Sequence, residues 1–350
     1  MANILKNKVI LVTGGTGSMG TEIVRTALAS EAKKVIVYSR DEIKHFMLRR
    51  RISDSRLESA IGDVRDRIAL ENVFTHNDID MVCHAAAMKH VVMCEEAPLE
   101  AAETNIRGTQ NVTDLALKYS VPKVVVISTD KAAYPVNVMG ATKLIAERIT
   151  LNASKLAAPG QVLSCVRYGN VAISRGSVIP VFIDSLIRHK PILVTDPEVT
   201  RFAMDISDAV KLVLKATEYA RGGEVFILKM RAFRLGDVVD VIVKRIAPKL
   251  KISPKDVNVE VSGLLKGEKL DEDLINRLEA QHLYTYGDMF IILEGKAAAK
   301  YPRLKKIELK EYTSRSAPRI SKDEIEGIIV RYLKEYMVLG ELKYGNGLNP

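Results

Sequence analysis

The chain has 350 residues, of which 47% are hydrophobic and 27% charged, and its formal net charge is +9. This length can bury a large core in one large domain or two unequal ones, and the composition is that of a soluble globular protein. No apolar run approaches the roughly 20 residues that a membrane-spanning helix needs. The N-terminus reaches an expected strand almost at once and lacks a secretory leader, so we expect a cytoplasmic protein with no membrane segment.

The positive charge does not by itself predict nucleic-acid binding. Lys and Arg are spread along the chain beside Asp and Glu, and the densest basic cluster, Arg49–Arg51, has no interleaved aromatic residues. A basic protein also suits small ligands that carry phosphates. Cys83, Cys94 and Cys165 are widely separated, which predicts reduced thiols and neither a metal site nor a disulfide framework.

Short β-branched runs alternate with amphipathic stretches in the first half of the chain, a pattern typical of a parallel sheet covered by helices. The expected strands are Lys8–Thr13, Lys34–Tyr38, Leu57–Ile61, Met81–His84, Lys123–Ser128 and Gln161–Arg167. The expected helices include Met19–Ala29, Ala97–Lys118 and Met139–Ser154. We therefore predict an α/β fold with a doubly wound parallel Rossmann-type sheet, which binds ligands at the carboxyl ends of its strands.

The alternation loosens after about Arg167. The later elements that we expect are helices Ser207–Glu218 and Leu235–Lys249, strand Glu224–Lys229, and a final helix Ser321–Tyr336 with a capping box formed by Ser321 and Glu324. Residues 1–173 should form the dinucleotide-binding domain, to which a segment near 205–230 returns. Residues 174–350 should form mainly a smaller, mixed α/β substrate-binding lobe and the C-terminal helix.

The first expected strand runs into a glycine-rich turn, in which Gly14, Gly17 and Gly20 are spaced three apart. This spacing permits a tight turn, close approach of the backbone to a pyrophosphate, and close packing of helix on strand. The N-terminus of the following helix supplies N–H groups for phosphates. The cofactor-binding residues that we expect here are Thr13, Gly14, Thr16, Gly17, Ser18, Met19 and Gly20.

The end of the second expected strand bears on the choice between NADP and NAD. An NAD site usually has an acid about 20 residues past the glycines, whereas Ser39 and Arg40 stand there, with Lys44 one turn on. Arginine can pair with a 2′-phosphate and stack on adenine, which favours NADP over NAD. Asp41 argues the other way, and an exposed loop position is the alternative for Arg40. Residues after the third and fourth strands complete the expected cofactor surface, or serve only packing: Asp63, Val64, Ala85, Ala86 and Ala87.

An acid and an amine, Asp130 and Lys131, directly follow the fifth expected strand. A plain salt bridge is the alternative, but this edge of the sheet is where ligands bind. Lys143 stands where a Tyr-x-x-x-Lys pair would end, and Met139 takes the place of the tyrosine. A thioether cannot accept a proton as tyrosinate does. Met139 either serves packing or marks a tyrosine-free variant of the chemistry.

These landmarks resemble the extended short-chain dehydrogenase/reductase superfamily. Within it the chain is similar to UDP-N-acetylglucosamine 4,6-dehydratases of polysaccharide biosynthesis, most closely the soluble 5-inverting type. The motifs span roughly residues 8 to 275, and they are Thr13–Gly20, Ser39–Asp41, Gly62–Asp66, His84–Lys89, Thr104–Thr109, Ser128–Ala132, Met139–Lys143, Arg167–Val171, Ser174–Pro180, Thr200–Phe202 and Lys266–Leu270. The last 75 residues of the chain match less clearly.

The resemblance implies a reaction and assigns its residues. Oxidation of the sugar at C4 makes C5–H acidic, a base removes that proton, an acid helps water to leave from C6, and hydride returns to C6. Lys131 would be the base and Asp130 the acid. Thr129 would hold the 4-oxygen, and Lys143 would bind the nicotinamide ribose. We also expect Lys143 and an enclosed site to lower the pKa of Lys131.

The resemblance also implies a binding surface for the substrate, UDP-N-acetylglucosamine or a related UDP-sugar. Arg201 would bind the diphosphate and Glu268 the uridine ribose. The other expected substrate residues are Lys89, Asn105, Asn170, Arg175, Ser177 and Val178, and Tyr168 and Asn170 would also border the cofactor. A surface or packing role is the competing interpretation for each.

Three other functions stay open: a C5-retaining UDP-sugar dehydratase, a nucleotide-sugar C4 epimerase, and a non-catalytic NADP-binding regulator. An epimerase needs no Asp–Lys pair and normally keeps the tyrosine. Helices Ala97–Lys118 and Met139–Ser154 correspond to the usual dimer contact of the superfamily, so we expect a homo-oligomer, at least a dimer.

Overall fold

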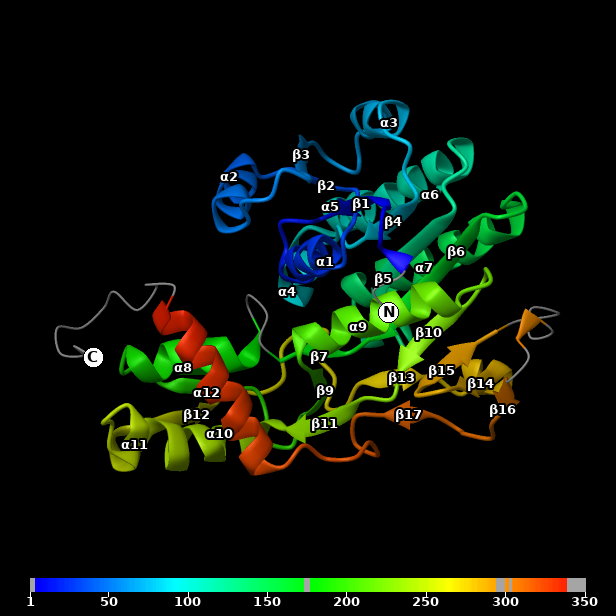
Figure 1. The fold of residues 1–350 in the computed structure, drawn as a ribbon. Coiled ribbons are helices and arrows are strands. Elements are labelled where there is room, and N and C mark those ends of the chain that lie inside the picture. The colour runs from blue at the N-terminus through cyan, green and yellow to red at the C-terminus, as the bar shows by residue number, and fades with distance from the viewer. Residues whose placement is uncertain (1–3, 173–176, 294–299, 302–303, 339–350) are drawn as a thin grey trace.

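The computed structural model describes residues 4–172, 177–293, 300–301 and 304–338. A ten-stranded sheet crosses the molecule in the order β16-β14-β15-β10-β6-β5-β4-β1-β2-β3 (Figure 1). Its strands are β1 (Val9–Thr13), β2 (Lys34–Ser39), β3 (Leu57–Ile61), β4 (Met81–His84), β5 (Lys123–Thr129), β6 (Val162–Tyr168), β10 (Val225–Leu228), β14 (Leu283–Tyr286), β15 (Met289–Ile292) and β16 (Lys305–Lys306). The strands from β3 to β10 pair in parallel, which confirms the predicted α/β fold.

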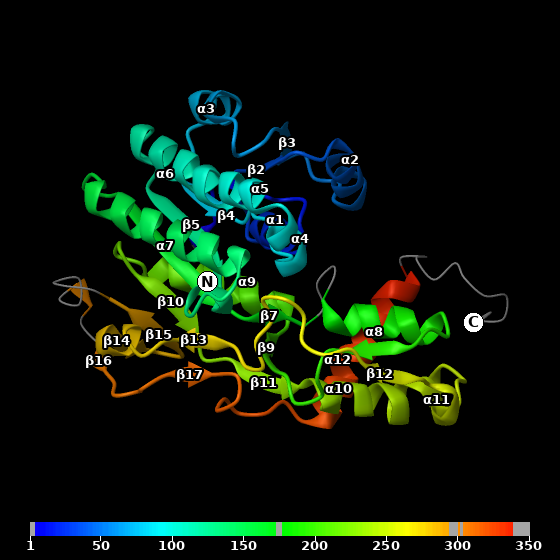
Figure 2. The ribbon, with the colours of Figure 1, turned by 180° about the vertical axis from the view of Figure 1, so that it is seen from behind.

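Helices cover both faces of this sheet. On one face lie α1 (Ser18–Ala29) and α9 (Ile206–Tyr219), which contact each other and stand in front in Figure 1. On the other face lie α3 (Arg67–Thr75), α6 (Gly108–Lys118) and α7 (Val138–Leu156), and Figure 2 shows α6 and α7 from that side. Every residue of β1 is buried, because a parallel strand covered on both faces meets no solvent.

The expected helix Ala97–Lys118 is interrupted, which corrects the sequence prediction. The chain forms α4 (Val91–Glu96), α5 (Pro98–Ala102), a π-helical turn (Glu103–Arg107) and then α6. The wider turn accommodates Asn105, whose side chain bonds to the backbone of a neighbouring loop. Such turns often mark functional sites. The expected helix Leu235–Lys249 is divided in the same way into α10 (Leu235–Val241), a π-helical turn (Ile242–Ile246) and α11 (Ala247–Lys249).

A second lobe has its own core, formed by residues such as Phe182, Ile242 and Ile329. Its helices are α8 (Val178–Ile187), α10, α11 and α12 (Lys322–Val338). Two small sheets accompany them: β11-β9-β7 and β12-β8. A third small sheet, β13-β17, packs against the core of the main sheet through Leu274 and Ile275. Their bounds are β7 (Asn170–Val171), β8 (Ile192–Val194), β9 (Thr200–Met204), β11 (Arg231–Arg234), β12 (Val259–Val261), β13 (Asp273–Ile275) and β17 (Tyr312–Thr313).

Two predictions about the second half of the chain are confirmed. Strand β10 returns to the main sheet and pairs in parallel with β6. The capping box at α12 is present: the amide of Ser321 donates to Glu324 Oε2 at 2.9 Å, and the amide of Glu324 donates to Ser321 Oγ at 3.2 Å. The sequence did not predict that β15, β14 and β16 extend the sheet beyond β10 in antiparallel fashion.

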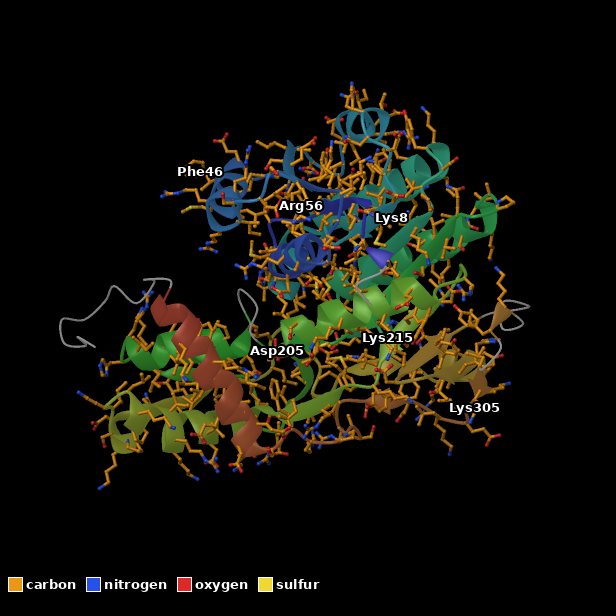
Figure 3. All side chains as sticks on the ribbon, in the orientation of Figure 1. Lys8, Phe46, Arg56, Asp205, Lys215 and Lys305 are labelled. Atoms are coloured by element: carbon orange, nitrogen blue, oxygen red, sulfur yellow. The ribbon has the colours of Figure 1, made fainter. Side chains whose placement is uncertain are left out.

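Charged side chains are distributed over the first and the second half of the chain, and Figure 3 labels Arg56 and Lys305 as examples. Helix α2 (Glu42–Arg51) also exposes apolar groups, and Phe46 is 62% exposed. Among the described residues no helix combines the length and the apolar character that a bilayer crossing requires.

Candidate active site

The glycine-rich turn joins β1 to α1 and forms a cradle at the carboxyl end of the sheet. Gly14 has φ +66°, and a Cβ there would lie 2.7 Å from the amide nitrogen of Ala86. A Cβ on Gly20 would lie 2.3 Å from the carbonyl oxygen of Gly14. Only glycine fits both positions, and α1 begins directly above with its N-terminus toward the turn. The cradle therefore fits the pyrophosphate of a dinucleotide.

A buried histidine fixes the floor of this cradle. His84 Nδ1 lies 2.6 Å from Thr13 Oγ1, and His84 Nε2 lies 3.1 Å from Thr109 Oγ1. Burial, helped by the charge of Lys143, lowers the pKa of His84 to about 3. The imidazole is therefore neutral at physiological pH, and it connects β1, β4 and α6.

The end of β2 presents Arg40 at the expected position of the adenosine ribose. Ser39 Oγ lies 2.9 Å from both Thr16 Oγ1 and His45 Nε2. The Arg40 side chain is 56% exposed, and its Nη1 lies 3.4 Å from Asp63 Oδ2. Its guanidinium is thus within reach of a ligand.

Asp41, the residue that argued for NAD, is engaged at the start of α2. Its Oδ1 accepts the amide of Lys44 at 3.0 Å, and its Oδ2 lies 2.7 Å from Lys44 Nζ. Asp63 accepts the amide and Nε of Arg65, at 3.0 and 2.9 Å. Val64 is buried, and a Cβ on Gly108 would lie 2.7 Å from it, so Val64 packs against α6.

Asp130 and Lys131 lie in a short 3₁₀ turn (Asp130–Ala132) that follows β5. Asp130 is completely buried, and its Oδ1 accepts Thr129 Oγ1 at 2.8 Å and Lys131 Nζ at 3.1 Å. Its other oxygen, Oδ2, is buried and has no hydrogen-bond partner among the described residues. Burial rules out an exposed salt bridge, and Oδ2 keeps an unused acceptor capacity beside Gly169.

The expected lowering of the pKa of Lys131 is wrong. Burial alone would lower this pKa, but the negative charges of Asp130 and Glu272 outweigh it, and the pKa is raised. Lys131 Nζ lies 3.1 Å from Glu272 Oε1. Glu272 is a residue that the sequence did not reveal, because it lies just beyond the Lys266–Leu270 motif and nothing in its spacing marks it.

Lys143 and Met139 lie on α7, behind the end of β5. Lys143 Nζ donates to the carbonyl oxygen of Ile127 at 2.5 Å, and burial lowers its pKa. Met139 is 4% exposed and packs against Cys94 and Ala101. The structure thus places the thioether in an apolar cluster between α7, α4 and α5.

Arg201 and Glu268, two expected substrate residues, form an ion pair of 2.7 Å. Arg201 Nη1 also donates to the carbonyl oxygen of Thr200 at 2.8 Å, and its Nε lies 3.9 Å from Glu272 Oε1. Lys131 and Arg201 therefore lie near the same carboxylate oxygen, Glu272 Oε1. The residue expected to bind the substrate diphosphate is thus close to the expected base.

The remaining expected substrate residues lie around this centre in different ways. The amide group of Asn105 accepts from Met88 N at 2.8 Å and donates to Met88 O at 3.1 Å and Thr142 Oγ1 at 2.9 Å, so it holds the loop that carries Lys89. Asn170 Oδ1, next to the end of β6, is buried without a partner among the described residues. Ser177 and Val178 stand at the start of α8. Tyr168, an expected cofactor residue, pairs with Thr129 across β5 and β6. Arg175 lies outside the described residues.

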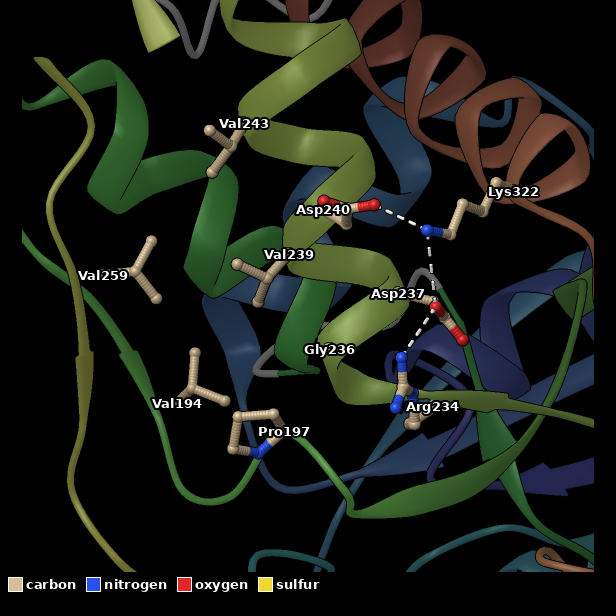
Figure 4. Close-up of a pocket in the computed structure, with 10 residues that line it drawn as sticks. All are labelled: Val194, Pro197, Arg234, Gly236, Asp237, Val239, Asp240, Val243, Val259 and Lys322. Carbon is tan, nitrogen blue, oxygen red and sulfur yellow. Dashed lines mark hydrogen bonds and ion pairs between the residues drawn. The ribbon is translucent and has the colours of Figure 1, made fainter. Parts of the chain in front are cut away.

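A separate groove of about 410 Å³ lies in the second lobe, between β8, β12 and α10 (Figure 4). Val194, Val239 and Val259 line it, and at its rim Lys322 Nζ lies 2.5 Å from Asp240 Oδ2. It contains none of the expected site residues.

Comparisons with known proteins place the chain in a family. Residues 10–294 match the family described as "Polysaccharide biosynthesis protein". A Methanocaldococcus jannaschii protein named as an uncharacterized membrane protein is 42% identical over 331 residues, which cover 94% of this chain and 97% of that protein. A Rickettsia typhi protein named UDP-glucose 4-epimerase is 36% identical, covering 93% of this chain and 96% of that protein.

Solved structures agree with this placement. The structure of Pen from Bacillus thuringiensis is 37% identical, with a TM-score of 0.86, and covers 93% of this chain and 98% of its own. The dTDP-glucose 4,6-dehydratase of Streptomyces venezuelae, solved with NAD bound, is 20% identical with a TM-score of 0.69 over 94% of this chain and 98% of its own, and so shares the fold. The chain belongs to the polysaccharide biosynthesis protein family.

Proposed function

We propose that the chain is a nucleotide-sugar 4,6-dehydratase that acts on UDP-N-acetylglucosamine with inversion at C5. One observation carries the proposal: a buried acid, Asp130, and a partly buried amine, Lys131, lie 3.1 Å apart at the carboxyl end of β5. Elimination of water needs an acid and a base side by side, whereas epimerisation does not. The family and the fold shared with a dTDP-glucose 4,6-dehydratase are consistent with this choice.

The residues of this chain divide the proton transfers between them. A bound nicotinamide would supply the redox chemistry, taking hydride from C4 and returning it to C6. Asp130 Oδ2, which has no partner among the described residues, accepts the proton of the C4 hydroxyl in place of the missing tyrosine. Asp130 is then a carboxylic acid, and this is the form that protonates the C6 hydroxyl as it leaves. Lys131, once its ammonium proton has gone to solvent, removes the proton from C5, and a proton from solvent is added to C5 on the opposite face.

The other residues bind and orient. The cradle from Thr13 to Gly20 would hold the pyrophosphate of the cofactor, and Lys143 would hold its nicotinamide ribose. Arg40 and Lys44, at the end of β2 and the start of α2, favour NADP over NAD. Arg201 would bind the diphosphate of the substrate, with Glu268 at the uridine ribose. We place this enzyme in the cytoplasm as a homo-oligomer that associates through α6 and α7.

A C4 epimerase is the second candidate, because the Rickettsia typhi relative carries the name UDP-glucose 4-epimerase at 36% identity. An epimerase returns hydride to C4 and expels no water. A C5-retaining dehydratase differs only in the face on which C5 is reprotonated.

One experiment separates these functions. The purified protein is incubated with NADP and UDP-N-acetylglucosamine in deuterated water, and the products are followed by NMR. We expect a 4-keto-6-deoxy sugar with deuterium at C5 and ring couplings of the inverted configuration. Formation of UDP-N-acetylgalactosamine, retention at C5, or no product would contradict the proposal. Lys131→Ala should bind the cofactor normally and form no product.

A further inference from the structure

Lys131 is held between two carboxylates that come from distant parts of the chain. Its Nζ lies 3.1 Å from Asp130 Oδ1 and 3.1 Å from Glu272 Oε1. The Glu272 side chain is only 3% exposed, and Glu272 immediately precedes β13. Strand β13 packs beside the turn that contains Asp130 and Lys131.

The backbone of Glu272 is fixed on both sides. Its amide donates to Ser314 Oγ at 2.9 Å, and the amide of Ser314 donates to the carbonyl oxygen of Glu272 at 2.8 Å. Ser314 Oγ in turn lies 2.6 Å from Thr200 Oγ1 on β9. Ser314 and Thr200 are both completely buried. Because its backbone is held in this way, the Glu272 side chain is fixed in its position against Lys131 and differs from a flexible contact at the surface.

Groups of both signs surround Lys131, and the negative ones lie closest to its ammonium. Asp130 and Glu272 are the two carboxylates that face its ammonium. Two cations also lie near Glu272: Arg201 Nε is 3.9 Å from Oε1, the oxygen that Lys131 contacts, and Lys269 Nζ is 3.6 Å from Oε2. The positive charge of Arg201 acts to lower the pKa of Lys131. Arg201 is itself paired with Glu268. Burial favours a neutral lysine, and the two carboxylates oppose that effect and win.

We propose that Glu272 is a positioning residue for Lys131, which holds the ammonium at the end of β5 and controls when it can act as a base. Its role in catalysis rests on the proposed function, whereas its effect on the ionisation of Lys131 does not. Removal of the Glu272 charge leaves Asp130 as the one carboxylate in contact with the ammonium among the described residues. The pH at which Lys131 becomes a free amine should then fall.

The test measures that ionisation without any need for activity. The protein with NADP bound is labelled briefly with trace acetic anhydride between pH 7 and pH 11, and acetylation of Lys131 is measured by peptide mass spectrometry. Lys266, whose side chain is 87% exposed, serves as an internal reference. Glu272→Gln should move the midpoint for Lys131 down by about one pH unit or more, which raises labelling below both midpoints about tenfold. An unchanged midpoint would overturn the proposal.

Matched variants separate charge from structure. Glu268 lies in the same segment as Glu272, but its carboxylate contacts Arg201 and not Lys131. Glu268→Gln should therefore leave the acetylation midpoint of Lys131 close to that of the wild type. Glu272→Asp keeps the charge but retracts it, so it should shift the midpoint in the same direction by a smaller amount. This variant also keeps the test decisive if Glu272→Gln does not fold.

Kinetics then connect the ionisation to the reaction. If the chain dehydrates UDP-N-acetylglucosamine, the pKa of the essential base in the pH profile of kcat/KM should fall in Glu272→Gln by the same amount as the acetylation midpoint. A shifted midpoint without any dehydration would refute the proposed function and leave the Glu272–Lys131 coupling intact. A shifted midpoint with an unshifted pH profile would overturn the catalytic role of Glu272.

Discussion

Glu147 and Arg167 are joined by two hydrogen bonds, of 3.0 and 2.6 Å, although both side chains are almost completely buried. Arg167 also donates to both carboxylate oxygens of Glu279, at 2.8 and 2.7 Å. Glu147 lies one helical turn beyond Lys143 on α7, and Glu279 follows β13. The network therefore ties the cofactor half of the molecule to the segment that carries Glu272.

Replacement of Arg167 by Met should destabilise the fold strongly. It leaves Glu147 and Glu279 buried without their cation, and loss of one partner from a buried ion pair costs about 3–5 kcal/mol. Urea unfolding gives this free energy. Arg188→Met is the control, because the Arg188–Asp184 pair is about half exposed and should contribute less than about 1 kcal/mol. Equal effects of the two substitutions would contradict a structural role for the buried network.

The buried His84 should make the fold sensitive to mild acid. Its pKa is about 3 in the folded protein, against 6.5 for the ordinary group. Between these values the unfolded chain binds one more proton, so stability is present above pH 6.5 and is lost as the pH falls. From pH 7 to pH 5 the loss should be about 2 kcal/mol.

Unfolding by urea at both pH values measures that loss in the wild type and in His84→Gln. The loss in His84→Gln should be smaller than that of the wild type by about 2 kcal/mol. His76→Gln alters an exposed histidine and should keep the pH dependence of the wild type. The interpretation fails if His84→Gln keeps it as well.

The exposed guanidinium of Arg40 should determine the preference for NADP. Loss of a charge-assisted contact to the 2′-phosphate costs about 1.5–3 kcal/mol, or roughly 10–100-fold in Kd. Arg40→Ala should weaken NADPH binding by that factor and change NADH binding little, as measured by cofactor fluorescence. Arg49→Ala, in the last turn of the following helix α2, should change neither. Tighter binding of NADH than of NADPH by the wild type would refute the preference.

Gly169 separates Asp130 from β9, and a methyl group there should disrupt the site. A Cβ would lie 2.4 Å from Phe202 Cβ and 3.0 Å from Asp130 Oδ2. Gly169→Ala should therefore lower both thermal stability and activity. Gly327→Ala is the matched control: it lies within α12 with no atom within 4 Å of the new Cβ, and it should stabilise the protein by about 0.5–1 kcal/mol. Thermal melts of both variants test the contrast, which would be refuted if Gly169→Ala melted like the wild type.

Met139 should contribute packing and no chemistry. Met139→Leu conserves volume and should cost less than about 1.5 kcal/mol, with turnover within a few-fold of the wild type. Met139→Ala opens a cavity beside Cys94 and should cost about 2–5 kcal/mol. Unfolding curves and the NMR assay report the two quantities. A large loss of turnover in a folded Met139→Leu variant would assign the sulfur a part in the reaction.

Local pattern was enough to predict the parallel strands, the glycine turn and the cap of α12. These depend on neighbours in sequence: alternation of β-branched runs, spacing of three glycines, and the Ser321–Glu324 pair. The π-helical turn at Asn105 was missed, because it depends on hydrogen bonds from Asn105 to the backbone of Met88, in a loop that is distant in sequence. Strands β14 to β16 were missed because they are short and lie at the edge of the sheet.

The ionisation of Lys131 could not be predicted from its sequence neighbours. Lys143 is close in the chain, but its ammonium is held by the Ile127 carbonyl behind β5. Glu272, far along the chain, is in direct contact. Electrostatics follow distance in space, and no periodicity encodes that contact.

The main sheet does not stop at the boundary expected near residue 173. Strand β10 lies between β6 and β15, so backbone hydrogen bonds run without interruption from the cofactor half to β16. A fragment cut after β6 would leave the edge of that strand that faces β10 unpaired from Cys165 to Arg167. It would also lose Glu279, one of the two carboxylate partners of Arg167. We therefore expect the two halves to unfold together, and the fragment cut after β6 to be less stable than the whole chain.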